Sequence, residues 1–130
     1  MLQKQTILSV ADNSGAKLLK IIGKYSNSRY STIGQIVTVS VKKCSSDFIH
    51  SKNKEGTKTR VKIFRALIVG TRQYYHRKNG TWIRYNKNFA VLLARNSKVE
   101  PMGTKISFPL LTEFSDWGYK KIFSLASKII

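Results

Sequence analysis

The chain has 130 residues, with 24 Lys and Arg against 6 Asp and Glu, and a formal net charge of +18. This length suits one domain with a single core, and a hydrophobic fraction of 42% excludes a disordered basic tail. No apolar run approaches the roughly 20 residues that a membrane-spanning helix needs, and a single cysteine excludes an internal disulfide and a multi-cysteine zinc site.

The first half of the chain is patterned as β-strands. A short segment of alternating character over 6–12 ends at four successive turn formers, and 16–25 follows as a second strand that ends near Gly23. The clearest strand is 35–41, because valines alternate there with hydroxyl residues. The polar, basic stretch 43–60 predicts an exposed loop.

The second half begins with a strongly β-forming run over 61–69. Asn79-Gly80 then separates two polar-aromatic segments and predicts a β-hairpin, because both residues tolerate the positive φ of a tight turn. Residues 89–93 have the composition of a buried strand, and 104–108 predict a further short one.

Two helices are expected at the end of the chain. A short helix is predicted within 110–117, and Ile122, Leu125, Ala126 and Ile129 recur at helical spacing. Many short strands followed by terminal helices predict a mainly β protein, a small closed antiparallel β-barrel. We expect a single domain over 1–130, with the barrel in about 1–108 and a helical segment in about 109–130.

The positive charge is spread along the whole chain. No acid lies between Glu55 and Glu100, whereas that interval carries 11 Lys and Arg. A domain with this excess repels itself and needs a polyanion, which makes nucleic acid the favoured partner over a membrane surface or an acidic protein.

Catalysis is not supported by the residue pattern. The six acids are scattered, His50 and His76 share no ligand spacing, and no phosphate-binding glycine loop is present. Cys44 lies near two lysines, a setting in which reactive thiols occur, but a small residue near a strand end is the simpler interpretation. We expect no enzyme, no cofactor and no metal site.

Two segments have the chemistry to bind RNA. The hairpin around Asn79-Gly80 interleaves cations with aromatic rings, which contact phosphates and stack on bases. The alternative is that its aromatic side chains face the core. The turn at 12–17 offers backbone N–H groups with Asn13 and Ser14, unless these side chains only satisfy their own turn.

A free single-stranded RNA-binding barrel of the cold-shock type is an alternative function. Such a module would cluster its aromatic residues on one sheet face at modest charge. Here the charge is high and the aromatic residues are split between the hairpin and the C-terminal segment.

Three blocks of residues carry a family resemblance. The chain opens with Met1-Leu2-Gln3 and continues through Val10-Ala11-Asp12-Asn13-Ser14-Gly15-Ala16-Lys17. Its middle has Ala66-Leu67-Ile68-Val69, Asn79-Gly80, Tyr85, Asn88 and Val91-Leu92, and its end has Gly103-Thr104-Lys105-Ile106, Pro109, Glu113, Lys121-Ile122 and Ser124-Leu125-Ala126. In order and spacing these blocks resemble the universal large-subunit ribosomal protein L-fourteen family.

The resemblance implies a five-stranded barrel with a protruding β-ribbon and short C-terminal helices. It also implies binding to large-subunit rRNA, bridges to small-subunit rRNA, contacts with ribosomal proteins L-nineteen and L-three, and a surface where the ribosome silencing factor docks. The implied rRNA-binding candidates are Asn13, Ser14, Lys17, Lys20, Lys42, Lys43, Arg72, Arg77, Lys78, Arg84 and Lys87. The implied subunit-interface candidates are Thr104, Lys105, Lys121 and Ser124.

The chain departs from the family pattern at several places. Gly34-Gln35 and Tyr85-Asn86 each lack the usual Asp, the loop 43–60 is longer than usual, and Phe108 replaces a glycine. Residues with AT-rich codons (Lys, Ile, Asn, Phe, Tyr, Met) number 51, against 23 with GC-rich codons (Gly, Ala, Arg, Pro). With no recognisable presequence, these features favour a protein made inside a mitochondrion, with a plastid or an AT-rich bacterium as alternatives.

Overall fold

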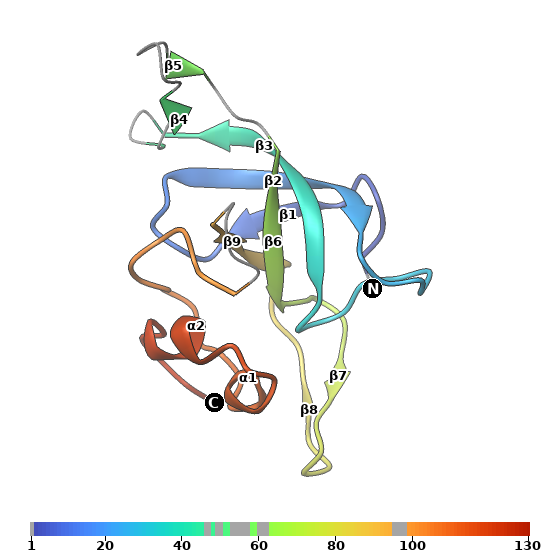
Figure 1. The fold of residues 1–130 in the computed structure, drawn as a ribbon. Helices are drawn as coiled ribbons and strands as arrows, with labels where there is room; N and C mark the ends of the chain where they lie inside the picture. The colour runs from blue at the N-terminus through green and yellow to red at the C-terminus, as the bar shows by residue number, and fades with distance from the viewer. Residues whose placement is uncertain (1, 46–47, 49–50, 53–57, 60–62, 95–98) are drawn as a thin grey trace.

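A five-stranded β-barrel forms the body of the molecule (Figure 1). The structure, a computed structural model, describes residues 2–45, 48, 63–94 and 99–130, and the backbone of the strands at 51–52 and 58–59. The barrel strands, in their order around the barrel, are β1 (Ile7–Val10), β2 (Ala16–Lys24), β3 (Ile36–Cys44), β6 (Ile63–Gly70) and β9 (Phe89–Leu93). The remaining elements are β4 (Ser51–Lys52), β5 (Lys58–Thr59), β7 (Tyr75–His76), β8 (Trp82–Ile83), α1 (Glu113–Asp116) and α2 (Lys120–Ser124).

The barrel is closed by a parallel pair. β1 is antiparallel to β2 but parallel to β9, while the β2–β3, β3–β6 and β6–β9 pairs are antiparallel. The mainly β class and the closed barrel are therefore confirmed, with the correction that one pair is parallel. Closure requires no hairpin between β1 and β9, so nothing in the connections imposes antiparallel pairing there. It also leaves no unpaired barrel edge.

Two hydrophobic cores share β6 and β9. Ala66 and Ile68 point into the barrel with residues of all five strands, whereas Leu67 and Val69 point outward. The outward residues pack with Ile106, Leu110, Leu111, Phe114 and Ile122, which belong to residues 99–130, here called the C-terminal segment. The period-two alternation therefore explains why β9 is buried along its whole length: one face fills the barrel and the C-terminal segment covers the other.

The C-terminal helix is shorter than its spacing predicts. α2 ends at Ser124, and Ala126 and Ile129 form parallel bridges with Ile106 and Leu110 instead of continuing the helix. The backbone N–H of Leu110 donates to the carbonyl of Lys128 at 3.0 Å. A short helix is marginal alone, so hydrogen bonds to a distant segment outcompete its extension. The expected strand over 104–108 is reduced to isolated bridges, which Ile106 forms with Asp12 and with Ala126.

The stretch 43–60 was expected to be an exposed loop, and this is wrong where it is described. β3 continues to Cys44, and Phe48 is buried in the barrel core. Its ring meets that of Phe64 edge-on, with 5.6 Å between the centroids. The phenylalanine supplies an apolar anchor within an otherwise polar stretch. The strands β4 and β5 pair with each other, and the rest of 46–62 lies outside the described residues.

The hairpin expected at Asn79-Gly80 is confirmed. β7 and β8 pair antiparallel and form a ribbon that projects from the barrel beside the C-terminal segment (Figure 1). Gly80 has a φ of +87°, and the Asn79 carboxamide oxygen accepts hydrogen bonds from the N–H and hydroxyl of Thr81. The turn itself differs from the tight turn that the dipeptide predicts, because Gly80 has a positive φ but Asn79 does not. The N–H of Gly80 donates to the carbonyl of Arg77 at 3.1 Å, and the N–H of Arg77 donates to the carbonyl of Thr81 at 2.9 Å.

Candidate nucleic-acid interface

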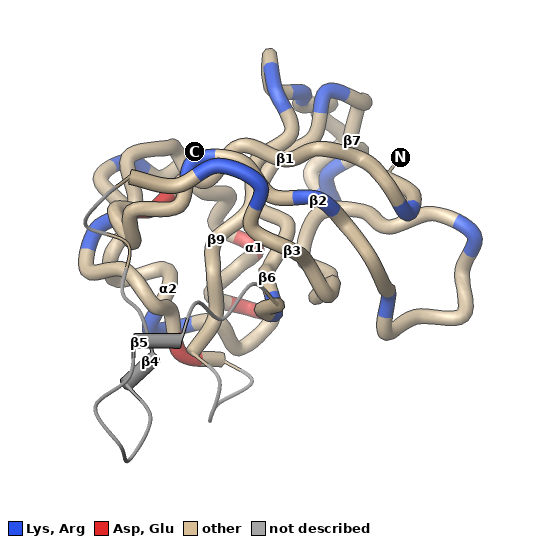
Figure 2. Tube along the Cα trace, turned by 90° about the horizontal axis from the view of Figure 1, so that it is seen from above, with Lys and Arg blue, Asp and Glu red and all other residues tan. Residues whose placement is uncertain are grey.

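The acids of the described chain are mostly engaged within the protein. Asp12 accepts hydrogen bonds from Ser14 and Leu92, Glu113 pairs with Arg77, and Glu100 pairs with Lys121. Lys and Arg, in contrast, are spread around the trace (Figure 2). The outer surface is therefore strongly positive, with few carboxylates left to neutralise it.

Three exposed lysines lie together at one end of the β2–β3 pair. Lys43 of β3 lies opposite Leu18 of β2 in the register. Lys17 precedes Leu18 on β2, and Lys42 precedes Lys43 on β3. None of the three has an acidic partner within the part of the chain that the structure describes. We call Lys17, Lys42 and Lys43 the barrel-end lysines. Lys20, nearer the middle of β2, is only half-exposed.

The turn that precedes β2 joins two parts of the chain. The Asn13 carboxamide oxygen accepts hydrogen bonds from the backbone N–H of Thr104 and Lys105, at 2.8 and 3.1 Å. Its amide donates to the Thr104 hydroxyl at 2.9 Å. Asn13 and Thr104, expected respectively at an rRNA contact and at the subunit interface, are thus neighbours. The turn thus holds the 103–105 segment, in which Thr104 and Lys105 are exposed.

Hydrogen bonds of Asp12 and Ser14 stabilise the same turn from within the protein. One Asp12 carboxylate oxygen accepts from the Ser14 N–H and hydroxyl, and the other accepts from the Leu92 N–H at 3.1 Å. Burial raises the pKa of Asp12 above its usual 3.8, and the hydrogen bonds oppose that rise only in part. Ser14 is buried with its hydroxyl on Asp12, so the structure uses this side chain inside the protein.

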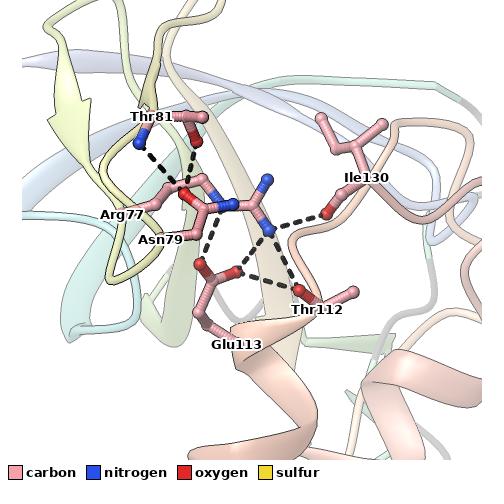
Figure 3. Close-up of polar contacts among 6 residues, drawn as sticks. All are labelled: Arg77, Asn79, Thr81, Thr112, Glu113 and Ile130. Atoms are coloured by element: carbon pink, nitrogen blue, oxygen red, sulfur yellow. Dashed lines mark hydrogen bonds and ion pairs between the residues drawn. The ribbon is translucent and has the colours of Figure 1, made fainter.

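On the β7–β8 ribbon, alternation sorts the expected cations into two groups. Arg72, Lys78 and Arg84 are exposed, as is Lys87 beyond the ribbon. Arg77 points the other way, toward the C-terminal segment. Its guanidinium donates to both carboxylate oxygens of Glu113, at 2.7 and 3.0 Å, to the Thr112 hydroxyl and to the carbonyl of Ile130 (Figure 3).

The Arg77–Glu113 pair is largely shielded from water. The two side chains are 14% and 11% exposed, and the hydrogen bonds from Arg77 hold the pKa of Glu113 below its usual 4.5. The expectation of Arg77 as an RNA-facing residue overlooked this partner. A period-two count from the half-buried Tyr75 places Arg77 on the same inward side, and that signal could have found it.

Tyr85 anchors the base of the ribbon. Its ring covers Gly70, where an added Cβ would lie 3.0 Å from the ring, and its hydroxyl donates to the carbonyl of Pro109 at 3.0 Å. Burial raises the pKa of Tyr85 to about 12, so the hydroxyl remains a donor at neutral pH. The aromatic residues of the hairpin are thus split, with Tyr75 and Tyr85 inward and Trp82 outward.

The subunit-interface candidates lie on exposed parts of the C-terminal segment. Lys105 and Thr104 are exposed beside Asn13, while Lys121 of α2 forms an ion pair with Glu100. The Ser124 hydroxyl donates to the carbonyl of Lys121 at 2.7 Å. The structure thus divides this group into a pair at the 103–105 segment and a pair on α2.

No metal centre or membrane helix is found in the described parts. Those residues contain no group of three His, Cys, Asp or Glu side chains able to hold a metal ion. They also contain no helix long and apolar enough to cross a membrane.

Comparison with known proteins identifies the family. A family model described as ribosomal protein L14p/L23e matches residues 1–130. The chain belongs to the ribosomal protein L14p/L23e family. The large ribosomal subunit protein uL14 of Aquifex aeolicus is 40% identical to it over 131 residues, and that of Aquifex pyrophilus is 39% identical. Both comparisons cover the whole of each chain.

Membership in the L14p/L23e family confirms the resemblance drawn from the residues. The chain is a structural constituent of the large ribosomal subunit, and its place is in a ribosome. The free RNA-binding barrel is not favoured. The ribbon, the barrel-end lysines and the C-terminal segment are therefore surfaces of a ribosomal protein.

Proposed function

We propose that this L14p/L23e protein is held in the large subunit by rRNA phosphates on its barrel-end lysines, and that it binds neighbouring ribosomal proteins as well. The observation that carries the proposal is the imbalance between engaged acids and exposed cations. Lysines held on paired strands meet phosphates as fixed point charges, which position the protein without reading sequence. Arg72, Lys78, Arg84 and Lys87 are further exposed cations, on or next to the ribbon.

Neutralising the barrel-end lysines should weaken rRNA binding. In the triple variant Lys17→Gln, Lys42→Gln, Lys43→Gln, the slope of log affinity against log salt should fall by about three, one unit for each lost phosphate contact. The measurement is RNA binding across a salt series, with sedimentation of tagged protein through sucrose gradients. The variant should leave the large-subunit peak at a lower salt concentration than the wild type.

The matched control is the pair Lys120→Gln, Lys128→Gln, which removes exposed charge from the C-terminal segment. It should keep the wild-type salt slope. A slope unchanged in the triple variant would reject the barrel-end contact. A slow, free peak of wild-type protein under all conditions would reject the ribosomal proposal as a whole.

A second proposal concerns the exposed C-terminal face. We infer that Thr104, Lys105, Lys121 and Ser124 meet small-subunit rRNA at the subunit interface, beside proteins L-nineteen and L-three, and that the silencing factor docks there. Support comes from their exposure and from the turn that fixes the 103–105 segment through Asn13. A cation held on a braced segment is suited to bridge a phosphate across an interface.

Reversing charge on this face should impair subunit joining but not large-subunit assembly. The double variant Lys105→Glu, Lys121→Glu should place two carboxylates against small-subunit phosphates and repel them. The readout is the ratio of joined ribosomes to free large subunits in gradients. The barrel-end triple variant should show the opposite pattern, with loss from the large subunit itself. Normal joining in the double variant would reject the interface assignment.

The ribosome that houses the protein is proposed to be mitochondrial. The support is the excess of residues with AT-rich codons and the loss of family acids at Gln35 and Asn86. Gradients prepared from a mitochondria-enriched lysate and from the remaining cell lysate separate this origin from a plastid or bacterial one.

A further inference from the structure

The β7–β8 ribbon has an inward and an outward face, because side chains alternate along its strands. Tyr75, Ile83 and Tyr85 pack toward the C-terminal core, on the same side as Arg77. The alternate positions, Tyr74, His76, Trp82 and Arg84, are exposed. Tyr74 is 58% and Trp82 is 64% exposed, so two large rings of the ribbon are open to solvent.

These outward side chains are stacked in two pairs across the ribbon. His76 stands opposite Trp82 in the strand register, and their ring centroids are 4.6 Å apart with a tilt of 49°. The Arg84 guanidinium carbon lies 5.0 Å from the centroid of the Tyr74 ring. Each large ring is therefore already ordered by its neighbour. A flat ligand that stacks on it would immobilise little additional side-chain freedom.

A polar hollow adjoins the Arg84 end of this face. Arg72, Arg84, Tyr85 and Asn86 line it, and its volume is about 470 Å³. Two guanidinium side chains in one hollow suit a phosphate group, which they can bind through paired N–H donors.

The charge around the face selects an anionic partner. Lys78 and Lys87 add to Arg72 and Arg84, and Glu113, which contacts the ribbon, is paired with Arg77 on the opposite side. The partner that combines negative charge with flat rings is nucleic acid in which the bases are not paired.

We propose that the outward face of the β7–β8 ribbon binds unpaired RNA nucleotides, with bases stacked on Tyr74 and Trp82 and a phosphate between Arg72 and Arg84. This deepens the proposed rRNA-binding function and rests on it. The barrel-end lysines bind phosphates of any folded RNA, whereas the ribbon face distinguishes unpaired from paired nucleotides, because only unpaired bases expose their π-faces.

The test compares a fluorescently labelled oligouridylate with an RNA duplex of the same length, using the full-length protein. Uridylates stack weakly on each other, so their bases are free to stack on the protein. The double variant Tyr74→Ala, Trp82→Ala should bind oligouridylate at least about tenfold more weakly. Its affinity for the duplex and its salt slope should remain those of the wild type. Arg72→Gln should instead lower the slope.

Tyr25→Ala is the matched control, since Tyr25 is also 64% exposed but lies outside the ribbon. It should bind both RNAs like the wild type. Unchanged oligouridylate binding in the double variant, or equal losses on both RNAs, would overturn the inference. The inference would also be overturned if the double variant bound both RNAs like the wild type but was lost from the large-subunit peak. The ribbon face would then bind a protein. Co-sedimentation of the wild type tests the rRNA-binding proposal separately.

Discussion

Replacing Arg77 with alanine should destabilise the fold by about 3 kcal/mol, because a shielded carboxylate would lose its partner. Glu113 is buried and accepts two hydrogen bonds from the guanidinium, which also donates to the Thr112 hydroxyl and the Ile130 carbonyl. Since Arg77 belongs to the ribbon and Glu113 to α1, the loss should also release the ribbon from the C-terminal segment. The measurement is the midpoint of urea unfolding.

The control is the second ion pair of the described structure. Lys121 and Glu100 are 65% and 48% exposed, so Lys121→Ala should cost less than about 1 kcal/mol. Comparable losses in the two variants would show that shielding from water does not set the strength of the Arg77 contact.

At acidic pH, the difference in unfolding free energy between the wild type and Arg77→Ala should become smaller. Because the folded pKa of Glu113 lies below 4.5, the contribution of the pair is fully present above that pH. It is lost as the pH falls through the lowered pKa, when the folded protein must take up the proton. A difference in unfolding free energy that stays constant through this range would assign the effect to packing of the Arg77 stem.

Replacing Gly34 with alanine should lower the free energy of unfolding by a similar amount, roughly 3 kcal/mol. Gly34 has a φ of +87°, and an added Cβ would lie 2.6 and 2.8 Å from two carbons of the Trp117 ring. That ring is itself held edge-on against Phe114, at 5.1 Å between centroids, and against Tyr75 at 6.4 Å. Trp117 therefore has little room to move away.

Gly80→Ala separates the two causes of this cost. Gly80 has the same φ of +87°, but nothing lies within 4 Å of an added Cβ. It should cost only the backbone strain, about 1 kcal/mol. The excess loss in Gly34→Ala then measures the clash with Trp117. Equal unfolding midpoints for the two variants would mean that the ring relaxes freely.

Much of the barrel could be predicted because its signals are local. Alternating valines in 35–41, turn formers after 6–12 and the Asn79-Gly80 dipeptide each determine a conformation within a few residues. The excess of positive charge is also a property of composition, so it indicates a nucleic-acid partner without knowledge of the fold.

The errors arose where distant segments compete with local preference. The spacing of Ile122, Leu125, Ala126 and Ile129 is helical. After Ser124, however, the backbone pairs with Ile106 and Leu110 and the helix does not continue. Arrangements of this kind depend on which element lies alongside, and periodicity within one segment carries no information about its neighbour.

The same distinction holds for the candidate site. By itself the sequence determined that the ribbon would carry cations and rings and that a turn at 12–17 would precede β2. Only the tertiary structure decided that Arg77 faces Glu113, that Asn13 holds the 103–105 segment, and that Tyr74 and Trp82 remain on the surface. The physical reason is that alternation specifies two faces of a ribbon, while the element packed against it selects which face is buried.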